Sequence, residues 1–519
     1  MELRFPSHSG WKVLGAFTVL ILLLPIIFVV STSFSIEAES WDQAFPTLLP
    51  LYIQNASILL VGICTVTLII GVSTAWLVTV FEFPFRKHFE WILILPLSIP
   101  TFINAIAYVG LTDYAGPVRI LLRSLGTDYY MDVMDHEGAI LIMGLVLYPY
   151  VYVAARSAFM LQSASLIDVS RSLGQSLTKT FFKVSIPLSW PIIFSGLILV
   201  IMEVLNDYGV VQYFGIPTFT TGIFRAWLAL GDLQTAILLS LIILVFIIIL
   251  VGLDTLIQRG RKTSSDNEDR VLTRIPFRHK WLAFSICVIP VFFGFIVPVA
   301  QMVWWSVLAS TVNVWLQSLR FMGNTAILGV ISGLVVLLFA IILSYSNRLT
   351  SQHWSSKAFS KLSMLGYAIP GAVIGIGIVT LVVWINPNWI YSGIIALVFG
   401  YSARFFAVGY GQTDAGFDKI PLQFDDAASS LGENSMKRLI SVHLPIMKPV
   451  LIGAFIMVFV DIAKELPLTL ILRPFNFETL ATNAFQYAKD EMAPKSASSS
   501  LLVIFVSSVP VYFLNKILK

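Results

Sequence analysis

Residues 425–445 read DDAASSLGENSMKRLISVHLP, a polar stretch inside a strongly apolar chain. A near copy, DVSRSLGQSLTKTFFKVSIP, occupies residues 168–187. Each copy contains a single glycine, and a proline follows that glycine at the same distance in both copies. The proline begins the next apolar run. Glycine adopts the left-handed conformation that ends a helix, and proline suits the first turn of a helix. Each copy therefore predicts two short helices joined at the glycine and followed by a membrane span.

The composition indicates a polytopic membrane protein. The 519 residues are 57% hydrophobic and only 12% charged, with a mean hydropathy of +0.85, whereas soluble domains carry about 25% charged residues. The net charge of +4 comes from basic residues at membrane edges and does not indicate nucleic-acid binding. Cys64 and Cys287 lie in apolar segments, so we expect no disulfide. Twelve segments are long enough to span a bilayer: 12–34, 56–80, 89–111, 138–158, 188–206, 233–256, 281–308, 324–346, 359–385, 389–410, 447–466 and 498–516.

The two halves of the chain are repeats. The acid, the glycine and the proline of the first polar copy recur in the second at one constant interval. Farther upstream, Asn55 matches Asn324 and Pro100 matches Pro370 at a longer interval, so the first half carries an extra stretch, which we place in the external segment 112–132. The predicted fold is all-α, with two parallel six-helix repeats related by an axis along the membrane normal. The predicted segments are an N-terminal span and external loop (1–50), repeat 1 (51–256), a cytoplasmic linker (257–280), the first span of the second half (281–319) and repeat 2 (320–516).

Basic residues between the spans predict the orientation. Cytoplasmic loops carry an excess of Lys and Arg. The N-terminus, residues 85–88, the linker, residues 347–361 and the C-terminal tail all carry Lys or Arg and fall on one side. The loop 35–46 carries acids and no Lys or Arg, so it is predicted to be external. Both termini and both polar copies are then cytoplasmic.

The two polar copies predict docking sites for another protein. Ala427, Ala428 and Leu431 form a small apolar face, and Lys179 matches Lys437 on the polar side. A helix lying on the membrane surface is the simpler alternative, but it has no need to repeat the glycine–proline spacing in both halves. The predicted docking residues are Asp168, Gly174, Lys179, Pro187, Asp426, Ala427, Ala428, Gly432, Lys437 and Pro445.

Both copies resemble the cytoplasmic coupling loop of ABC importer permeases, whose pattern is E-A-A-x3-G-x9-I-x-L-P. The chain keeps the glycine, the spacing and the final proline, and it has Asp168 and Asp426 in place of the glutamate. Val169 and Ser170 replace the paired alanines in the first copy. The resemblance implies a fused permease of the type I importer fold, whose two loops dock on two copies of an ATPase subunit. ATP and Mg are expected on those partners, because the chain has no G-x4-G-K-[ST] phosphate loop.

Four acids lie in or beside the predicted spans. Glu203 and Asp207 form one pair, and Asp461 and Glu465 form a second pair at the matched positions of the other repeat. The i,i+4 spacing places the two acids of each pair on one helix face. Glu203 follows Pro187 by sixteen residues, which is ~24 Å of helix. The pairs are therefore predicted near the external ends of their spans.

These acids admit two interpretations. Charges within spans are costly and mark a transport path or a partner, and four converging carboxylates would attract a hard metal cation. Alternatively, some acids pair with Lys464 or Arg473, or cap helix ends. Tyr208 and Tyr213 are weaker candidates for a metal path, because interfacial tyrosines are common in packing roles. The scarce, scattered His and Cys residues offer no soft-metal site.

Residues 206–232 and 463–491 resemble the external loops of the ferric-iron branch of these permeases. The resemblance implies import of ferric iron that a periplasmic binding protein delivers, and hence an inner membrane. The chain itself is expected to bind no cofactor. The same machinery carrying thiamine, a polyamine or another small solute stays open, and an ion-coupled secondary transporter is a third hypothesis that needs no ATPase dock. An enzyme is disfavoured, because no nucleophile–base constellation is present.

Overall fold

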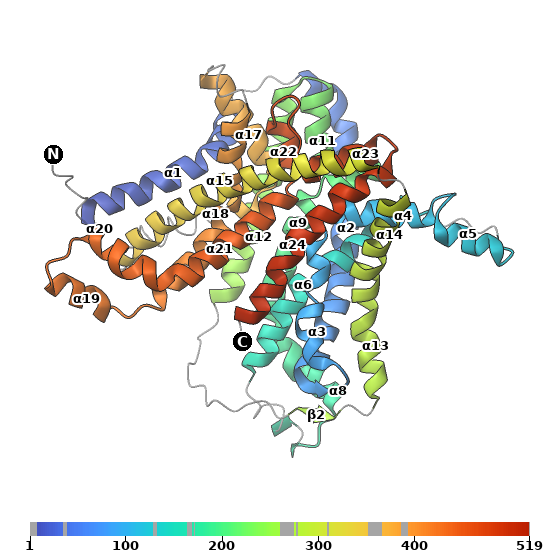
Figure 1. Ribbon diagram of the computed structural model, residues 1–519, viewed down its shortest axis with the longest axis horizontal. Coiled ribbons are helices and arrows are strands. Elements are labelled where there is room, and N and C mark those ends of the chain that lie inside the picture. Colours follow the sequence, from blue (N-terminus) through green and yellow to red (C-terminus); the bar gives the residue numbers. More distant parts are fainter. Residues whose placement is uncertain are drawn as a thin grey trace. The chain divides into compact units, whose positions relative to one another are not determined.

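The computed structural model describes residues 8–34, 39–127, 132–162, 169–170, 172–259, 274–276, 279–308, 311–350, 366–385 and 393–517. Asp168, residues 260–273 and 277–278 of the predicted linker and residues 351–361 of the predicted basic loop lie outside the described residues. So do residues 359–365 and 389–392, at the starts of two predicted spans. The described chain is almost entirely helical, as predicted (Figure 1). A helix satisfies its own backbone hydrogen bonds, which a bilayer interior requires. One parallel pair of two-residue strands, β1 (Phe81–Glu82) and β2 (Ile275–Pro276), joins the end of the linker to the end of α2 (Glu39–Val80).

In the described part of the chain, nine helical segments are long and apolar enough to cross a membrane, or up to ten if one bent pair is counted. Each of the nine overlaps a predicted span. Besides α2 they are formed by α1 (His8–Ser33), α6 (His136–Leu161), α8 to α9 (Leu177–Asn206), α12 (Leu233–Arg259), α13 to α14 (Lys280–Leu308), α15 (Val312–Thr350), α18 (Ile394–Asp418) and α20 to α21 (Ser435–Lys464).

The matched prolines Pro100 and Pro370 mark where two of the predicted spans differ from single long helices. Proline has no N–H to donate and restricts the residue before it. The first of these spans is broken at Pro100, and its two parts are bent by 86°. In the second, residues 366–368 are helical, and a 15-residue helix follows Pro370. The elements are α3 (Arg86–Ile92), η1 (Leu95–Ser98) and α4 (Thr101–Thr112) in the first half, and α17 (Gly371–Ile385) in the second.

The predicted last span is helical as α24 (Ala497–Ile517). The extra stretch of the first half contains α5 (Pro117–Ser124), which follows α4 after a short turn (Figure 1). The additional segment predicted between the third and fourth spans of this half therefore contains a separate short helix.

The chain divides into two compact units. Unit 1 contains residues 1–40, 223–241 and 316–483. In unit 1, α18 packs along α21 and α1 packs along α17. Gly377 allows this second contact, because a Cβ at that position would lie 2.2 Å from the carbonyl oxygen of Pro25 on α1. The first helix of the sequence is therefore packed among helices of the second half.

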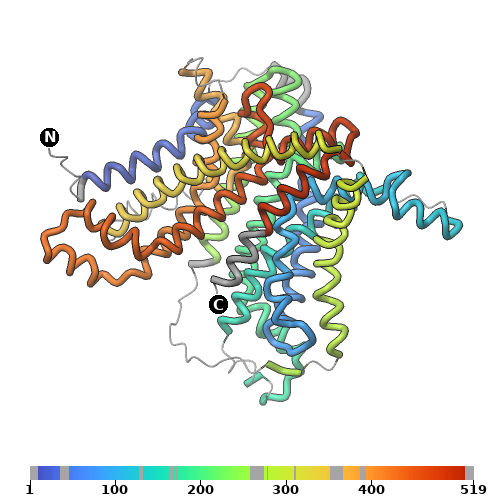
Figure 2. The backbone as a smooth tube through the Cα atoms, in the orientation of Figure 1, coloured from blue at the N-terminus to red at the C-terminus, as the bar shows by residue number. Residues whose placement is uncertain are grey.

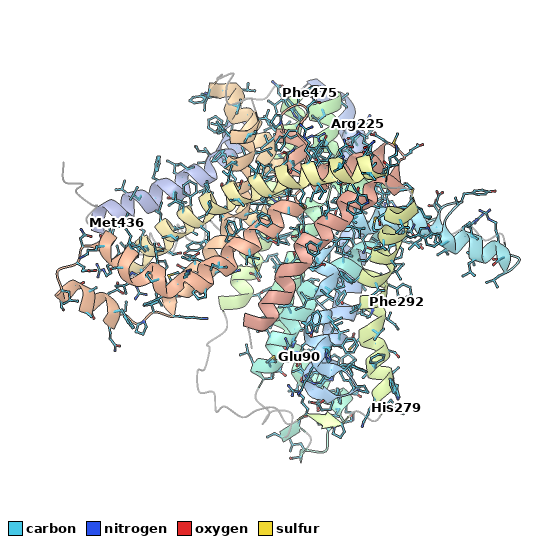
Figure 3. The ribbon with its side chains drawn as sticks, viewed as in Figure 1. Glu90, Arg225, His279, Phe292, Met436 and Phe475 are labelled. Carbon is cyan, nitrogen blue, oxygen red and sulfur yellow. The ribbon has the colours of Figure 1, made fainter. Side chains whose placement is uncertain are left out.

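Unit 2 contains residues 41–222, 242–315 and 484–519. Here α6 packs on α9 and on α4, while α14 packs on α24 and on α4. Glu90, labelled on α3 in Figure 3, accepts from Arg86 at 2.8 Å and from Arg156 at 3.1 Å. Unit 2 thus holds the first helices of the second half, so neither unit coincides with one sequence repeat.

The loops that follow α9 and α21 repeat a hydrogen-bond pattern across the two halves. Asn55 Nδ2 donates to the carbonyl of Pro217 at 2.8 Å, and Asn324 Nδ2 donates to the carbonyl of Glu478 at 2.9 Å. In each loop the next N–H donates to a threonine hydroxyl three residues farther on; these pairs are Thr218–Thr221 and Thr479–Thr482. The repeat therefore extends through these loops, into α11 (Phe219–Phe224) and α23 (Leu480–Lys489).

Candidate functional site

The first coupling segment (168–187) and the second coupling segment (425–445) turn in the same way. Gly174 has φ +79° and Gly432 has φ +78°, so both adopt the predicted left-handed conformation. The residue after each glycine donates its N–H to a carbonyl five residues back, at 3.1 Å in both segments. This bond is the C-terminal helix cap expected around a left-handed glycine. In the second segment it closes α19 (Gln423–Ser430).

After the glycine, both segments restart a helix with a side-chain cap. Ser176 Oγ accepts from the N–H of Lys179 at 3.3 Å, and Asn434 Oδ1 accepts from the N–H of Lys437 at 2.8 Å. Pro187 and Pro445 stand in the first turns of α9 and α21, as predicted. The elements between cap and proline are α8 (Leu177–Thr180) and a π-helical turn (Phe181–Ser185), and α20 (Ser435–Arg438) and a π-helical turn (Leu439–His443).

The exposed surface of the coupling segments differs in one respect from the predicted apolar face. Ala427 is exposed, but Ala428 is buried and cannot contact a partner directly. The leucines that precede the two glycines are strongly exposed, Leu173 by 75% and Leu431 by 83%. Lys179, Lys437 and Asp426 are also exposed. A matched leucine, rather than the alanine pair, is thus the common apolar feature of both surfaces.

The second coupling segment contains a charged cluster that the sequence analysis missed. Asp425, beside the predicted Asp426, turns inward and lies 2.9 Å from Nε of Arg348. Arg438 and His443 reach the other carboxylate oxygen. The signal was the unmatched charge itself, because the apolar Ile167 occupies the corresponding position of the first repeat. Arg348 lies on another helix, far from Asp425 in sequence, and no local spacing connects the two.

The first acid pair lies at the C-terminal end of α9 (Ile186–Asn206) in unit 2. Asp207 accepts from the N–H of Val210 at 2.8 Å and so caps α10 (Gly209–Tyr213). Its other oxygen accepts from the hydroxyl of Thr101. Glu203 accepts from the hydroxyl of Tyr150 at 3.2 Å. Loss of solvation raises the pKa of Asp207 to about 6. Each of these side-chain donors is a neutral group.

The second acid pair lies at the C-terminal end of α21 (Leu444–Lys464) in unit 1. Glu465 accepts from the N–H of Leu468 at 3.0 Å and caps α22 (Pro467–Leu472), as Asp207 caps α10. It differs in being 3.0 Å from Nε of Arg404, and both of these side chains are buried. Gly371, the counterpart of Thr101, leaves room for the pair: a Cβ there would lie 2.5 Å from Oε1 of Glu465.

The alternative interpretation of these acids was that they cap helix ends. Asp207 and Glu465 do cap helices. Arg404 is a cationic partner of Glu465, and Arg473 pairs with Glu478. Among the described residues, no three His, Cys, Asp or Glu side chains form a group that could hold a metal ion. The two pairs belong to different units, so their convergence on a transport path stays a prediction.

The two candidate tyrosines are packed against aromatic rings. Tyr208 is buried, with its ring centroid 5.7 Å from that of Phe485, and the ring centroid of Tyr213 lies 6.1 Å from that of Phe214. Burial raises the pKa of each tyrosine to about 12. Both phenols are therefore protonated at neutral pH, which favours packing over metal ligation.

Comparison with known proteins identifies the family. Two segments, 67–263 and 337–519, match the family described as binding-protein-dependent transport system inner membrane component. The chain belongs to this family. The two matched segments are the two repeats, and the protein is an ABC importer permease with several membrane spans, a transport subunit rather than an enzyme.

Relatives of this permease carry different substrates. The Fe(3+)-transport system permease protein FbpB 2 of Haemophilus influenzae is 25% identical over 506 residues, 95% of this chain and 96% of that protein. The spermidine/putrescine transport system permease protein PotB of the same organism is 25% identical over 217 residues, which cover 39% of this chain and 76% of that protein. A probable sulfate transport system permease protein of Chlorokybus atmophyticus is 24% identical over 203 residues, 38% of this chain and 69% of that protein.

Proposed function

We propose that the permease imports ferric iron across the inner membrane. The observation that carries this substrate is the Fe(3+)-transport permease, which matches both repeats and nearly the whole of both chains. The polyamine and sulfate relatives match less than half of this permease. Residues 206–232 and 463–491 in addition resemble the external loops of ferric-iron permeases.

Two ATPase subunits dock on the permease, one at each coupling segment. Each segment offers an exposed leucine, a glycine turn and an exposed lysine at matched positions, and each leads directly into a long apolar helix. A displacement of the segment by a closing ATPase is therefore transmitted to α9 or α21. Mg-ATP is bound and hydrolysed on these partners, and the permease alternates between outward-open and inward-open states.

A periplasmic binding protein delivers the iron on the opposite side of the membrane. The acid pairs follow α9 and α21, at the ends remote from the coupling segments. Carboxylates there attract a hard trivalent cation and lower the cost of its passage. Both termini are cytoplasmic in this arrangement, because the basic loops lie on the side of the coupling segments.

Uptake into proteoliposomes tests this proposal. The vesicles contain the permease, its ATPase and its binding protein, and radiolabelled ferric iron, putrescine and thiamine are supplied in separate reactions. Iron accumulation that requires both ATP and the binding protein supports the proposal. Accumulation of putrescine or thiamine instead of iron would overturn the substrate while leaving the ABC permease intact. A vesicle with a catalytically inactive ATPase is the matched control for ATP binding without hydrolysis.

A further inference from the structure

The inward-turned Asp425 joins both helices of the second coupling segment to the rest of unit 1. Its Oδ2 lies 2.9 Å from Nε of Arg348, and its Oδ1 lies 3.2 Å from Nε2 of His443 and 3.7 Å from Nη1 of Arg438. We call these four residues the Asp425 clamp. His443 is fully buried, and the other three side chains are 8–12% exposed. The hydrogen bonds of the carboxylate come from Arg348, which donates from Nε and Nη2 to Oδ2, and such charge-assisted bonds from a guanidinium are the strong ones.

Arg348 connects the segment to two long helices. It projects from the last turn of α15, and its Nη1 donates to the carbonyl of Phe417 at 2.6 Å. Its Nη2 donates to the carbonyl of Ile420 at 2.9 Å. The Phe417 carbonyl lies in the last turn of α18, and Ile420 follows the end of that helix. The planar guanidinium fork, which stays charged at any physiological pH, thus fixes α15, the end of α18 and the start of α19 against one another.

Arg438 connects the two short helices of the segment. It lies on α20, and its Nη1 donates to the Asp425 carbonyl at 3.2 Å and to Ser429 Oγ at 2.8 Å on α19. The glycine turn between α19 and α20 is therefore bridged by a charged side chain. Without that bridge, Gly432 would be a flexible point between the two helices.

A further set of contacts holds the start of α20. Tyr345 on α15 donates its hydroxyl to the carbonyl of Ser435 at 2.6 Å, and Trp11 on α1 donates its indole N–H to Ser435 Oγ at 3.0 Å. Both rings belong to a buried apolar cluster with Phe417, and Met436, labelled in Figure 3, packs against it. Figure 2 shows α19 and α20, in orange, at one end of unit 1 beside the beginning of α1.

The first coupling segment has neutral groups at the corresponding positions. Thr180 stands at the position that matches Arg438, and Ser185 at the position that matches His443. Thr180 shares a hydrogen bond of 2.8 Å with Ser170, and Gln162 donates to the carbonyl of Ser185 at 2.8 Å. Hydrogen bonds between neutral groups are about half as strong as charge-assisted ones. In the described part of the first segment the contacts named here are hydrogen bonds between neutral groups, whereas the second segment is held by the ion pair of Asp425 and Arg348.

We propose that the Asp425 clamp is a positioning device that makes the second coupling segment the stiffer of the two. The two ATPase subunits then act on the permease unequally: movement of the second segment is passed to α15, α18 and α21 with little loss, whereas the first segment yields before it moves its helices. Stiffness alone follows from the clamp; unequal coupling rests in addition on the proposed docking of ATPases.

Hydrogen exchange on the full-length permease in lipid nanodiscs tests the stiffness without any partner. Arg348→Lys keeps the charge but loses the fork, and we expect exchange in α19 and α20 to rise about tenfold, the factor for one lost charge-assisted hydrogen bond. Exchange in the first segment is expected to stay unchanged. Asp425→Asn, which keeps the side-chain size, serves as a second variant. Unchanged exchange in α19 and α20 in both variants would overturn the clamp.

Transport per ATP hydrolysed tests the unequal coupling in the assembled complex. We expect Arg348→Lys to lower the ratio of transport to ATP hydrolysis about tenfold, because one charge-assisted hydrogen bond is lost. The yield of assembled complex is expected to stay the same. The matched control is Thr180→Val, which removes the hydrogen bond to Ser170 in the first segment and is expected to lower the ratio much less. Equal losses in the two variants would overturn the inequality. A wild-type complex that does not transport iron would contradict the proposed function. The clamp would then be tested by the hydrogen-exchange measurement alone, which requires no partner.

Discussion

The two acid pairs occupy matched positions in the repeats, yet the side chains that contact Asp207 and Glu465 differ in charge. Asp207 and Glu465 both accept from the N–H three residues ahead, so the capping geometry is repeated. The partner is not repeated, because Asp207 meets the neutral hydroxyl of Thr101 while Glu465 meets the guanidinium of Arg404. The second half therefore neutralises one of its two acids with a cation, where the matched acid of the first half meets a hydroxyl. An equivalent sequence position keeps the geometry without keeping the electrostatic field.

The buried pair of Arg404 and Glu465 predicts the largest effect on stability. Arg404→Ala leaves Glu465 uncompensated in an apolar surrounding, and we expect the free energy of unfolding to fall by about 3–5 kcal/mol. Thermal or denaturant unfolding in a fixed detergent measures the loss. The double variant Arg404→Leu with Glu465→Gln removes both charges and keeps the acceptor for the N–H of Leu468, so it should recover most of the stability. A double variant as unstable as the single one would contradict the ion-pair explanation.

The two coupling glycines predict a smaller effect of similar size in both halves. Gly174→Ala and Gly432→Ala introduce a Cβ at φ near +80°, where an added Cβ meets no atom within 4 Å. Only the backbone is strained, which costs about 1–2 kcal/mol, and we expect the protein to fold but transport per ATP to drop about fivefold. Helical glycines with equally open surroundings, Gly252 and Gly411, are the controls. Alanine variants of all four that couple alike would show that the left-handed turns are dispensable.

The loop-capping asparagines predict the smallest effect. Asn55→Ala and Asn324→Ala each remove one hydrogen bond to a loop carbonyl, which is worth about 1 kcal/mol. Asn55 also contacts His136 through its Oδ1 at 3.1 Å, so its substitution should cost slightly more. Unfolding midpoints of the two variants measure the difference. A large loss of stability for Asn324→Ala alone would contradict the expectation. It would mean that the loop of the second half depends on this bond more than the matched loop of the first half does.

Much of the scaffold could be predicted from sequence because its signals are local. Apolar runs predict the spans, the constant interval between matched landmarks predicts the repeat, and Gly174 and Gly432 predict the left-handed turns that the structure has. The match between Pro100 and Pro370 is visible in the sequence, but the 86° bend at Pro100 is not, since the sequence alone does not say how sharply a proline bends a span. The exchange of the first helices between the two units leaves no sequence signal at all.

The charges of the candidate site could be predicted only in part because their partners are remote. Glu465 pairs with Arg404 on α18, and Asp425 pairs with Arg348 on α15, so each partner lies on a different helix. Pairing of one of the acids with Lys464 stays a prediction. Of the predicted apolar face, Ala427 and Leu431 are exposed and Ala428 is buried, and docking on this face stays a prediction.

Iron uptake by two amide variants tests most directly whether the acids serve transport. One variant combines Glu203→Gln with Asp207→Asn, and the other combines Asp461→Asn with Glu465→Gln, each compared with wild type at equal amounts of folded complex. Because Arg404 already neutralises Glu465, we expect the first variant to lose about tenfold in initial ferric-iron uptake, which corresponds to about 1.4 kcal/mol, and the second to lose less. Uptake unchanged in both variants would contradict a role of these carboxylates in the transport path and leave them as helix caps.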